Sequence, residues 1–290
     1  MSDYVIMTDS SCDLSQQMAD KLGLSVLPLK FTLEGKEYRN LQDNSEIDIK
    51  YVYDQMRAGK QVMTTAVNID DARAAMEEKL RQGLDIFWMA FSSALSSTYQ
   101  NTYAAAELLK DKYPDRKIIV VDTKCASLGQ GLYVYLAAKK KAEGLSIDQL
   151  LEWAEDIKLH IVHWFTVDDL FHLKRGGRVS GATALVGSML GIKPVMHVDD
   201  LGRLINVSKA RGRKASINAL FEHMRDTAID PAKQTVFISH GDCLDDAELL
   251  AGMIRKELGV KDININVVGP VIGAHSGPGT LALFFVGRER

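Results

Sequence analysis

Short apolar runs that end in small polar residues recur along the first half of this chain of 290 residues. The clearest runs, with their polar ends, are residues 4–8 with Asp9, Ser10 and Ser11, residues 85–91 with Ser92 and Ser93, and residues 117–121 with Asp122 and Thr123. Helical patterns follow them, from near Leu14 and over residues 96–112 and 129–143. This order is typical of βαβ units around a parallel sheet, whose ligand crevice lies at the carboxyl ends of the strands. We therefore expect the polar turns to share one crevice.

The pattern changes near residue 160, after a helix predicted over residues 145–160 with Ser146 and Gln149 as a capping box. Beyond it we expect a hairpin over residues 194–198 and 204–208 and three further strands over residues 235–240, 263–268 and 280–286. Two helices are expected between these strands, over residues 212–226 and 245–258. A smaller hairpin is expected over residues 31–38. The sequence thus predicts an α/β protein with two domains. Residues 1–160 form a parallel-sheet domain, and residues 161–290 form an α/β domain with a mixed or antiparallel sheet.

Composition excludes several classes of function. A formal net charge of −3 and a pI of about 6.2 give no electrostatic reason to expect a nucleic acid or an anionic membrane as partner. The sequence begins without a basic and apolar leader, and no apolar run approaches the ~18 residues that cross a bilayer. We therefore expect a cytoplasmic protein without an integral membrane segment. The three cysteines, Cys12, Cys125 and Cys243, lack metal-ligand spacing, so no metal site is predicted.

Paired hydroxyl residues at expected strand ends are candidate anion ligands. They are Ser10 and Ser11, Thr64 and Thr65, and Ser92 and Ser93, the last followed by Ser96, Ser97 and Thr98. Hydroxyls together with free backbone N–H groups at a helix start suit a carboxylate or a phosphate. Helix capping is the alternative, because Ser and Thr are common caps. Since a cap needs only one residue, the doublets favour ligand binding.

Two glycine-rich segments in the second half carry further candidates. Residues 269–280 hold four glycines and two prolines, which predict a rigid, irregular loop, and its His275 is suited to donate a hydrogen bond to an acid group. Residues 173–180 place Arg175 and Arg178 around a Gly-Gly turn, predicted as a compact, flexible, positive loop. An arginine fork suits phosphate or a docking partner, and a solvated basic loop is the alternative.

Ser239 and His240, followed by Asp242, invite interpretation as a hydrolase. Adjacent residues in a strand point to opposite faces, and the chain has no Gly-x-Ser-x-Gly elbow, so a catalytic triad is disfavoured. The sequence also has no Walker loop or Gly-x-Gly-x-x-Gly fingerprint for a nucleotide of its own.

Taken in order, these stretches resemble the DegV family, the fatty-acid-binding proteins that serve bacterial fatty acid kinase. The similarity extends over nearly the whole chain. It is carried by Thr-Asp-Ser-Ser-Cys-Asp-Leu at residues 8–14, Thr-Thr at 64–65, Ser-Ser-Ala-Leu-Ser-Ser-Thr-Tyr-Gln at 92–100, Asp-Thr-Lys at 122–124, Leu-Lys-Arg-Gly-Gly-Arg-Val-Ser at 173–180, Lys-Pro at 193–194 and Gly-Ala-His-Ser-Gly-Pro-Gly at 273–279. No single motif is decisive, but the ordered set is specific.

The resemblance implies a long-chain fatty acid buried between two domains, with its chain running into the N-terminal one. The carboxylate would be held by Thr64, by a serine of the Ser-Ser pair, with Ser93 preferred over Ser92, and by His275, with Thr65 nearby. Arg175 and Arg178 would help to dock the kinase or meet a phosphate. The chain itself would have no catalytic residue and no cofactor. A separate fatty acid kinase catalytic subunit would phosphorylate the acid with ATP, and the acyl phosphate would pass to an acceptor enzyme of phospholipid synthesis.

The chain departs from the family pattern at three positions. Ala66 and Val67 replace the usual Gln and Pro after the Thr doublet, and Ser97 replaces a glycine. These changes leave the proposed carboxylate ligands in place but alter the crevice. Phe91, Ile118, Leu128 and Leu132 are conceivable tail contacts, although ordinary core packing is the better explanation of their apolar character.

Two other functions stay open from the residues alone. One is a hydrolase or phosphotransferase of small substrates that uses His275 or His240 as nucleophile or base. The other is a ligand-responsive interaction protein for which a lipid is only a signal. Burial energetics favour the carrier, because about fourteen methylenes at about 0.8 kcal/mol each gain on the order of 10 kcal/mol before association costs.

Overall fold

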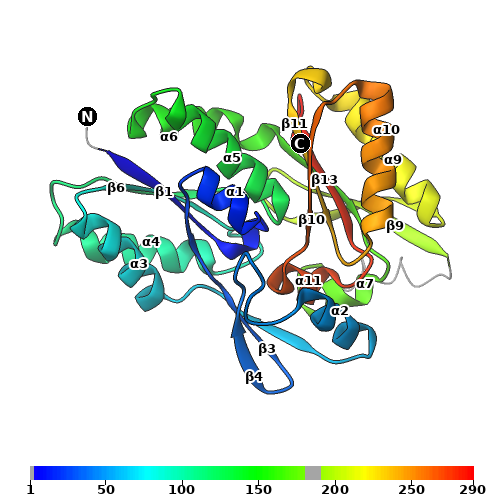
Figure 1. Ribbon diagram of the computed structural model, residues 1–290, viewed down its shortest axis with the longest axis horizontal. Helices are drawn as coiled ribbons and strands as arrows, with labels where there is room; N and C mark the ends of the chain where they lie inside the picture. The colour runs from blue at the N-terminus through cyan, green and yellow to red at the C-terminus, as the bar shows by residue number, and fades with distance from the viewer. Residues whose placement is uncertain (1–2, 180–190) are drawn as a thin grey trace.

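The computed structural model describes residues 3–179 and 191–290, which form three sheets with helices between and around them (Figure 1). Ser180, the last residue of the predicted arginine and glycine segment, lies outside the described residues. Within the described chain, no helix is long and apolar enough to cross a membrane.

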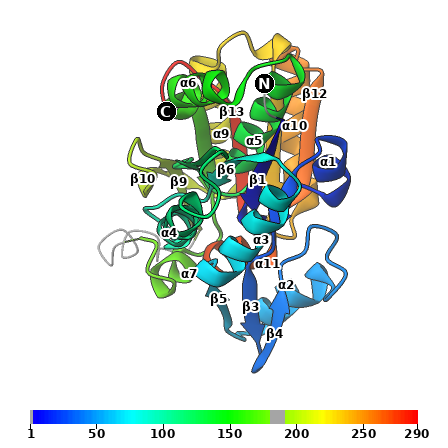
Figure 2. The same ribbon diagram turned by 90° about the vertical axis from the view of Figure 1, so that its left-hand side faces the viewer.

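The first sheet is parallel, as predicted, and its strand order is β2-β1-β6-β7. Its strands are β1 (Tyr4–Asp9), β2 (Ser25–Leu27), β6 (Asp85–Ala90) and β7 (Ile118–Asp122). Helices α3 (Ile69–Arg81) and α4 (Thr98–Lys110) cover one face, and α5 (Leu128–Ala142) and α6 (Ile147–Ile157) cover the other (Figure 2). Side chains alternate between the faces, so Ile6 packs toward α5 while Val5 and Met7 pack toward α3 and α4. The Ser146–Gln149 capping box starts α6 as expected.

A small antiparallel sheet, β4-β3-β5, extends from the first domain. It contains the predicted hairpin, β3 (Lys30–Leu33) with β4 (Lys36–Arg39), and the strand β5 (Val62–Thr65). Helix α2 (Ile49–Arg57) precedes β5 and lies beside α11 (Pro270–Ser276) in both views. Strand β5 therefore carries the Thr64–Thr65 doublet toward an element from the far end of the chain.

The third sheet is mixed, with the order β10-β9-β8-β13-β11-β12. Its strands are β8 (Ile161–Thr166), β9 (Ile192–Val198), β10 (Leu204–Arg211), β11 (Thr235–His240), β12 (Asp262–Val267) and β13 (Leu281–Val286). All neighbours are antiparallel except β11 and β12, which confirms the predicted mixed sheet. Helices α9 (Arg213–Thr227) and α10 (Leu244–Leu258) pack on one face. The other face turns toward α5, so the cores of the two halves are continuous.

The prediction of an irregular loop over residues 269–280 is wrong, because Pro270–Ser276 forms the helix α11. Pro270 occupies its first turn, where a proline is pre-organised and no backbone donor is lost. Gly273 is needed for packing rather than for irregularity, since a Cβ there would collide with the hydroxyl of Tyr53. Gly277 ends the helix at a φ of 81°.

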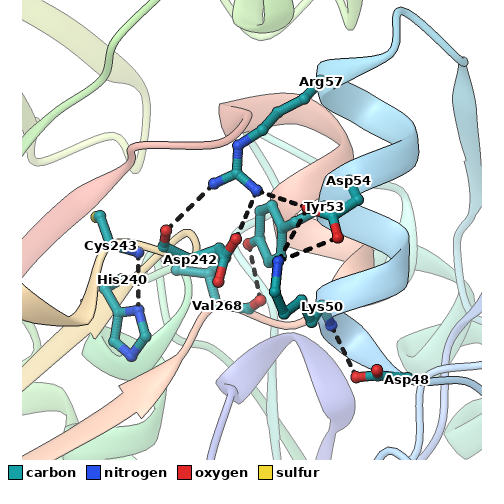
Figure 3. Close-up of polar contacts among 9 residues, drawn as sticks. All are labelled: Asp48, Lys50, Tyr53, Asp54, Arg57, His240, Asp242, Cys243 and Val268. Atoms are coloured by element: carbon teal, nitrogen blue, oxygen red, sulfur yellow. Dashed lines mark hydrogen bonds and ion pairs between the residues drawn. The ribbon is translucent and has the colours of Figure 1, made fainter.

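Hydrogen bonds fasten the two halves together. Tyr53 on α2 donates to the carbonyl of Val268 at 2.8 Å, and Arg57 pairs with Asp242 (Figure 3). A further contact between the halves is made by Lys124, which donates to the carbonyl of Asp200 at 3.0 Å. The predicted division at residue 160 stays a prediction, because α2 packs on the second half and α5 packs on the third sheet.

Candidate functional site

A cavity of about 310 Å³ lies between the first domain and the face of the third sheet that turns toward α5. We call it the inner cavity. Its wall is largely apolar and draws on both halves of the chain. The described apolar lining residues are Leu29, Ala66, Phe91, Leu95, Ala126, Phe165, Leu173, Val198, Leu204, Val268, Val271, Ile272, Ala282 and Phe284. The volume falls within the range of ordinary small-molecule sites. Strands β8 and β13 supply part of the wall, through Phe165 and Phe284. The expectation that an acyl tail runs into the N-terminal domain stays a prediction.

Several polar side chains in this wall are already hydrogen-bonded within the protein. Ser127 donates to the carboxylate of Asp13 at 2.6 Å, and the hydroxyl of Ser239 lies 3.0 Å from that of Ser127. His163 lies between the carbonyl of Ile161 at 2.9 Å and the backbone N–H of Ala126 at 3.3 Å. Burial, together with the nearby Arg290, lowers the pKa of His163 well below its usual value, so the ring is neutral. Because these groups are satisfied, this region favours an apolar ligand segment.

Thr64 and His275 meet at one end of the cavity. Oγ1 of Thr64, on β5, lies 2.8 Å from Nε2 of His275, on α11. Burial and, to a smaller extent, the positive charge of Arg178 lower the pKa of His275 to about 4. The imidazole is therefore neutral at physiological pH. Its buried Nδ1 has no hydrogen-bond partner among the described residues. A Cβ at residue 176 would collide with this nitrogen, so Gly176 allows the turn to close over the ring.

Arg178 brings a positive charge to the same end. Its side chain is half-buried, and it donates to the carbonyls of Leu95, at 3.1 Å, and Gly176. No carboxylate of residues 3–179 or 191–290 lies within ion-pair distance of it. Burial lowers the pKa of Arg178, although a guanidinium stays charged in proteins. An anion between Arg178 and His275 would compensate this charge.

A second cavity of about 380 Å³ adjoins the first and shares with it Thr64, Arg178 and His275. Its other described lining residues are Met56, Lys60, Gln61, Val62, Met63, His172, Arg175, Gly176 and Ala274. We call it the outer cavity. The prediction that Arg175 lies in a flexible loop is wrong, because Arg175 is the last residue of helix α7 (Leu170–Arg175). After the helix, Gly177 turns the chain at a φ of 72°.

The structure brings some of the predicted carboxylate ligands together and separates others. Thr64, Thr65 and His275 line the inner cavity. In contrast, Ser92 donates to the carbonyl of Gly202 at 2.9 Å, and Ser93 donates to Asp122 at 2.6 Å. Among the described residues, these two serines are outside the lining of both cavities. Their role as carboxylate ligands stays a prediction.

The departures from the family pattern also have identifiable surroundings. Ala66 and Ser97 line the inner cavity, together with Ser96 of the same run of hydroxyl residues. The backbone N–H of Val67, which a proline would lack, donates to Thr98 at 3.3 Å. Of the conceivable tail contacts, Phe91 lines the cavity. The other three, Ile118, Leu128 and Leu132, pack in the hydrophobic core, as the alternative predicted.

The residues that invited a hydrolase interpretation do not form a nucleophile and base. Nδ1 of His240 accepts a hydrogen bond from the backbone N–H of Cys243 at 3.3 Å (Figure 3). The hydroxyl of Ser239 contacts Ser127 instead of His240. In the part of the chain that the structure describes, no group of three or more His, Cys, Asp or Glu side chains is placed to hold a metal ion.

Fold and site together define a two-domain α/β protein with a largely apolar cavity. Beside a hydroxyl–imidazole pair, this cavity adjoins a second one that is lined by basic residues. The sequence model described as "Uncharacterised protein, DegV family" matches residues 3–288. A DegV domain-containing protein of Clostridium perfringens is 47% identical over 290 residues, which are 100% of this chain and 99% of the relative. The chain belongs to the DegV family.

Solved structures share this fold. A hypothetical protein from Thermotoga maritima, described as revealing fatty acid binding function, is 27% identical with a TM-score of 0.86 over 99% of this chain and 100% of that one. The Fak B3 protein of fatty acid kinase from Streptococcus pneumoniae was solved loaded with linoleic acid. At 20% identity it shows the fold alone, with a TM-score of 0.85 over 98% of this chain and 99% of that one.

Proposed function

We propose that this protein binds one long-chain fatty acid in the inner cavity, with the carboxyl end at Thr64 and His275. The observation that carries the proposal is the asymmetry of the cavity. Its wall is largely apolar, whereas the unpartnered Nδ1 of His275 and the cation of Arg178 gather at one end. Burial of each methylene contributes about 0.8 kcal/mol, so the tail supplies most of the affinity. The fatty-acid binding described for the Thermotoga maritima relative supports the same ligand class.

The head group needs hydrogen-bond donors, because a buried carboxylate without them is costly. The neutral pair offers the acid one donor in either tautomer: Nδ1–H of His275 when Thr64 donates to Nε2, or the hydroxyl of Thr64 when Nε2–H donates to Thr64. Arg178 supplies the opposite charge. Thr65 lies on the same wall and is a further candidate. Ser93 can bind the carboxylate only if its hydroxyl gives up its hydrogen bond to Asp122. Ser92 would likewise have to give up its hydrogen bond to Gly202.

The bound acid is presented to a separate, ATP-dependent fatty acid kinase. A carboxylate oxygen attacks the γ-phosphorus of ATP, ADP departs, and an acyl phosphate forms, so the carrier needs no catalytic residue and no cofactor. Arg175 and Arg178 lie where the carboxyl end emerges and would serve kinase docking or phosphate binding. The acyl phosphate then passes to an acceptor enzyme of phospholipid synthesis. The description of one structural neighbour as a kinase component supports this role.

Reconstitution tests this proposal. The protein, loaded with hexadecanoic acid, is mixed with a purified fatty acid kinase catalytic subunit and ATP, and acyl phosphate is measured as its hydroxamate. We expect product only when both proteins are present. If the protein binds the acid but no kinase catalytic subunit forms acyl phosphate from it, a ligand-responsive interaction protein is the better description. Hydrolysis of acyl phosphate by this protein alone, abolished by His275→Ala, would support the enzyme instead.

A further inference from the structure

The side chain of Arg290 joins several segments that lie far apart in the sequence. Its partly buried guanidinium makes five contacts, one for each N–H donor that an arginine has. The acceptors are the carbonyls of Lys124 at 2.8 Å, Lys158 at 3.1 Å, Ile161 at 3.2 Å and Asp199 at 3.2 Å, and the sulfur of Cys125 at 3.1 Å. The whole donor set of this side chain is therefore used to hold other parts of the protein together.

The segments that Arg290 joins carry side chains of the inner cavity. Lys124 and Cys125 belong to the turn between β7 and α5, Ile161 begins β8, and Asp199 directly follows β9. The lining residues nearest to them in the chain are Ala126, Ser127, His163, Phe165 and Val198. None of these five is among the described lining residues of the outer cavity. They belong to the part of the wall that would surround an acyl tail.

The turn of the β9–β10 hairpin is fixed to the first half by two further hydrogen bonds. Ser92 donates to the carbonyl of Gly202 at 2.9 Å, and Lys124 donates to the carbonyl of Asp200 at 3.0 Å. The fit is close, because a Cβ at Gly202 would collide with the hydroxyl of Ser92. The turn thus lies directly against the first half of the chain.

Arg290 adds its own hydrogen bond at Asp199, where this turn begins. Val198 and Leu204 stand on either side of the turn, and both line the inner cavity. Their contact with a tail requires that the turn stays in place, since a gap of about 0.5–1 Å between two atoms already removes roughly a quarter to a half of their attraction. The apolar wall at these two residues therefore depends on the guanidinium.

The same guanidinium also helps to fix His163 in the wall. The carbonyl of Ile161 accepts from Nε of Arg290 and lies 2.9 Å from Nδ1 of His163. Because Nε2 of His163 accepts from the backbone N–H of Ala126, the neutral ring carries its proton on Nδ1 and donates to that carbonyl. A fixed, neutral ring suits an apolar ligand segment.

We infer that Arg290 is a positioning residue for the acyl tail: it holds the β7–α5 turn, the start of β8 and the β9–β10 turn together around the inner cavity. This inference rests on the proposed function, because the tail must occupy that cavity. It adds that tight binding of a long acid depends on a residue that lines neither cavity in the described chain and has no part in binding the carboxylate.

The test compares a long and a short ligand with the same head group, hexadecanoic acid and decanoic acid, by titration calorimetry. We expect Arg290→Ala to weaken hexadecanoic acid about tenfold and decanoic acid by less than about threefold, because a shorter tail uses less of the wall that Arg290 holds. Arg288→Ala removes the same charge from an exposed position and is the matched control, which should change neither affinity. Melting temperatures of the ligand-free variants check their folding.

Arg290→Lys separates the charge from the shape of the side chain. Lysine keeps the charge but places three donors on one nitrogen, which cannot reach all the segments that the planar guanidinium joins. We therefore expect Arg290→Lys to lose affinity for hexadecanoic acid in the same chain-length-dependent way as Arg290→Ala, although to a smaller extent. If Arg290→Ala does not fold, Arg290→Lys provides the same comparison of the two acids.

Equal losses for both acids would show that Arg290 supports the fold in general and does not position the tail. An unchanged affinity for hexadecanoic acid would show that the wall keeps its place without Arg290. Either result overturns the inference and leaves fatty-acid binding intact. Failure of the parent protein to bind hexadecanoic acid would overturn the proposed function and this inference with it.

Discussion

The hydroxyl of Thr64 lies 2.8 Å from the imidazole of His275, although 211 positions separate the two residues in the sequence. One stands on a strand of the small sheet and the other on a short helix near the end of the chain. Both belong to the wall that the two cavities share. The pair is therefore the point at which an apolar tail inside the protein would meet a polar group outside it.

Thr64→Val should weaken hexadecanoic acid binding about tenfold or more, because a hydrogen bond to a charged group contributes about 1.5–3 kcal/mol. Ser93→Ala should change the affinity by less than about threefold if its hydroxyl stays on Asp122 in the bound state. Calorimetric titration of both variants, with melting temperatures as a check on folding, measures the difference. If Ser93→Ala lost much affinity and Thr64→Val lost little, the carboxylate would be bound by the serine pair and not beside His275.

The low pKa of His275 makes a prediction for stability. The native pKa of about 4 lies below the usual 6.5, so between these values the unfolded chain takes up a proton that the native protein does not. The stability attributable to a neutral His275 is complete above about pH 6.5 and is lost as the pH falls toward 4. The free energy of unfolding of the ligand-free parent should fall relative to that of His275→Gln between about pH 7.5 and pH 4.5. A constant difference would show that His275 titrates normally.

Asp13 should have the opposite effect. Burial raises its pKa from 3.8 to about 7, despite hydrogen bonds from Ser127 and the backbone of Gly269. Between these two values the native protein binds a proton that the unfolded chain lacks. The contribution of Asp13 to the free energy of unfolding therefore increases as the pH falls from about 7 toward 4. The parent should gain stability relative to Asp13→Asn over that range, by at most about 1.4 kcal/mol per pH unit. Denaturant unfolding of both proteins at several pH values measures it, and a gain with rising pH would contradict the assignment.

The sequence predicts most of the fold, because hydrophobic runs and turn residues act locally. The parallel sheet, the hairpin at residues 31–38 and the capping box at Ser146 all follow from short patterns. The pattern does not predict helix α11, because Gly273 within it and the glycines that flank it suggest a loop. Only the approach of Tyr53, from a distant helix, shows why residue 273 must be small. A short helix that contains a glycine is stable where tertiary packing outweighs local preference.

The site divides in the same way. Thr64 and His275 were recognised as candidates because their residue types suit an acid. The direction of the hydroxyl at Ser92 was not predictable, because it depends on how the two halves dock, whereas the hydroxyl of Ser93 meets Asp122 in the same half. The carbonyl that Ser92 meets belongs to Gly202, 110 positions away. The outer cavity was missed for the same reason, since Lys60 and Arg175 converge only in the folded chain.

Ala282 offers a test of where the tail lies. This buried residue of β13 lines the inner cavity, beside Phe284 of the same strand. Ala282→Leu should fill space that the end of a long acid needs, and so weaken hexadecanoic acid more than dodecanoic acid, by about tenfold relative to the parent. Ala282→Val should have an intermediate effect. Affinities for a series of saturated acids measure the shift, and equal losses at every chain length would place the tail elsewhere.

The central claim, that the inner cavity holds a fatty acid, is tested most directly by mass spectrometry of the organic extract of the purified, denatured protein. The account predicts a fatty acid of about 14–18 carbons, the length that the resemblance to the DegV family implies, in an amount close to one molecule per chain. The contradicting result is a folded, monodisperse protein that yields no fatty acid and binds none when hexadecanoic acid is added. A small-molecule enzyme would then become the leading explanation of the site.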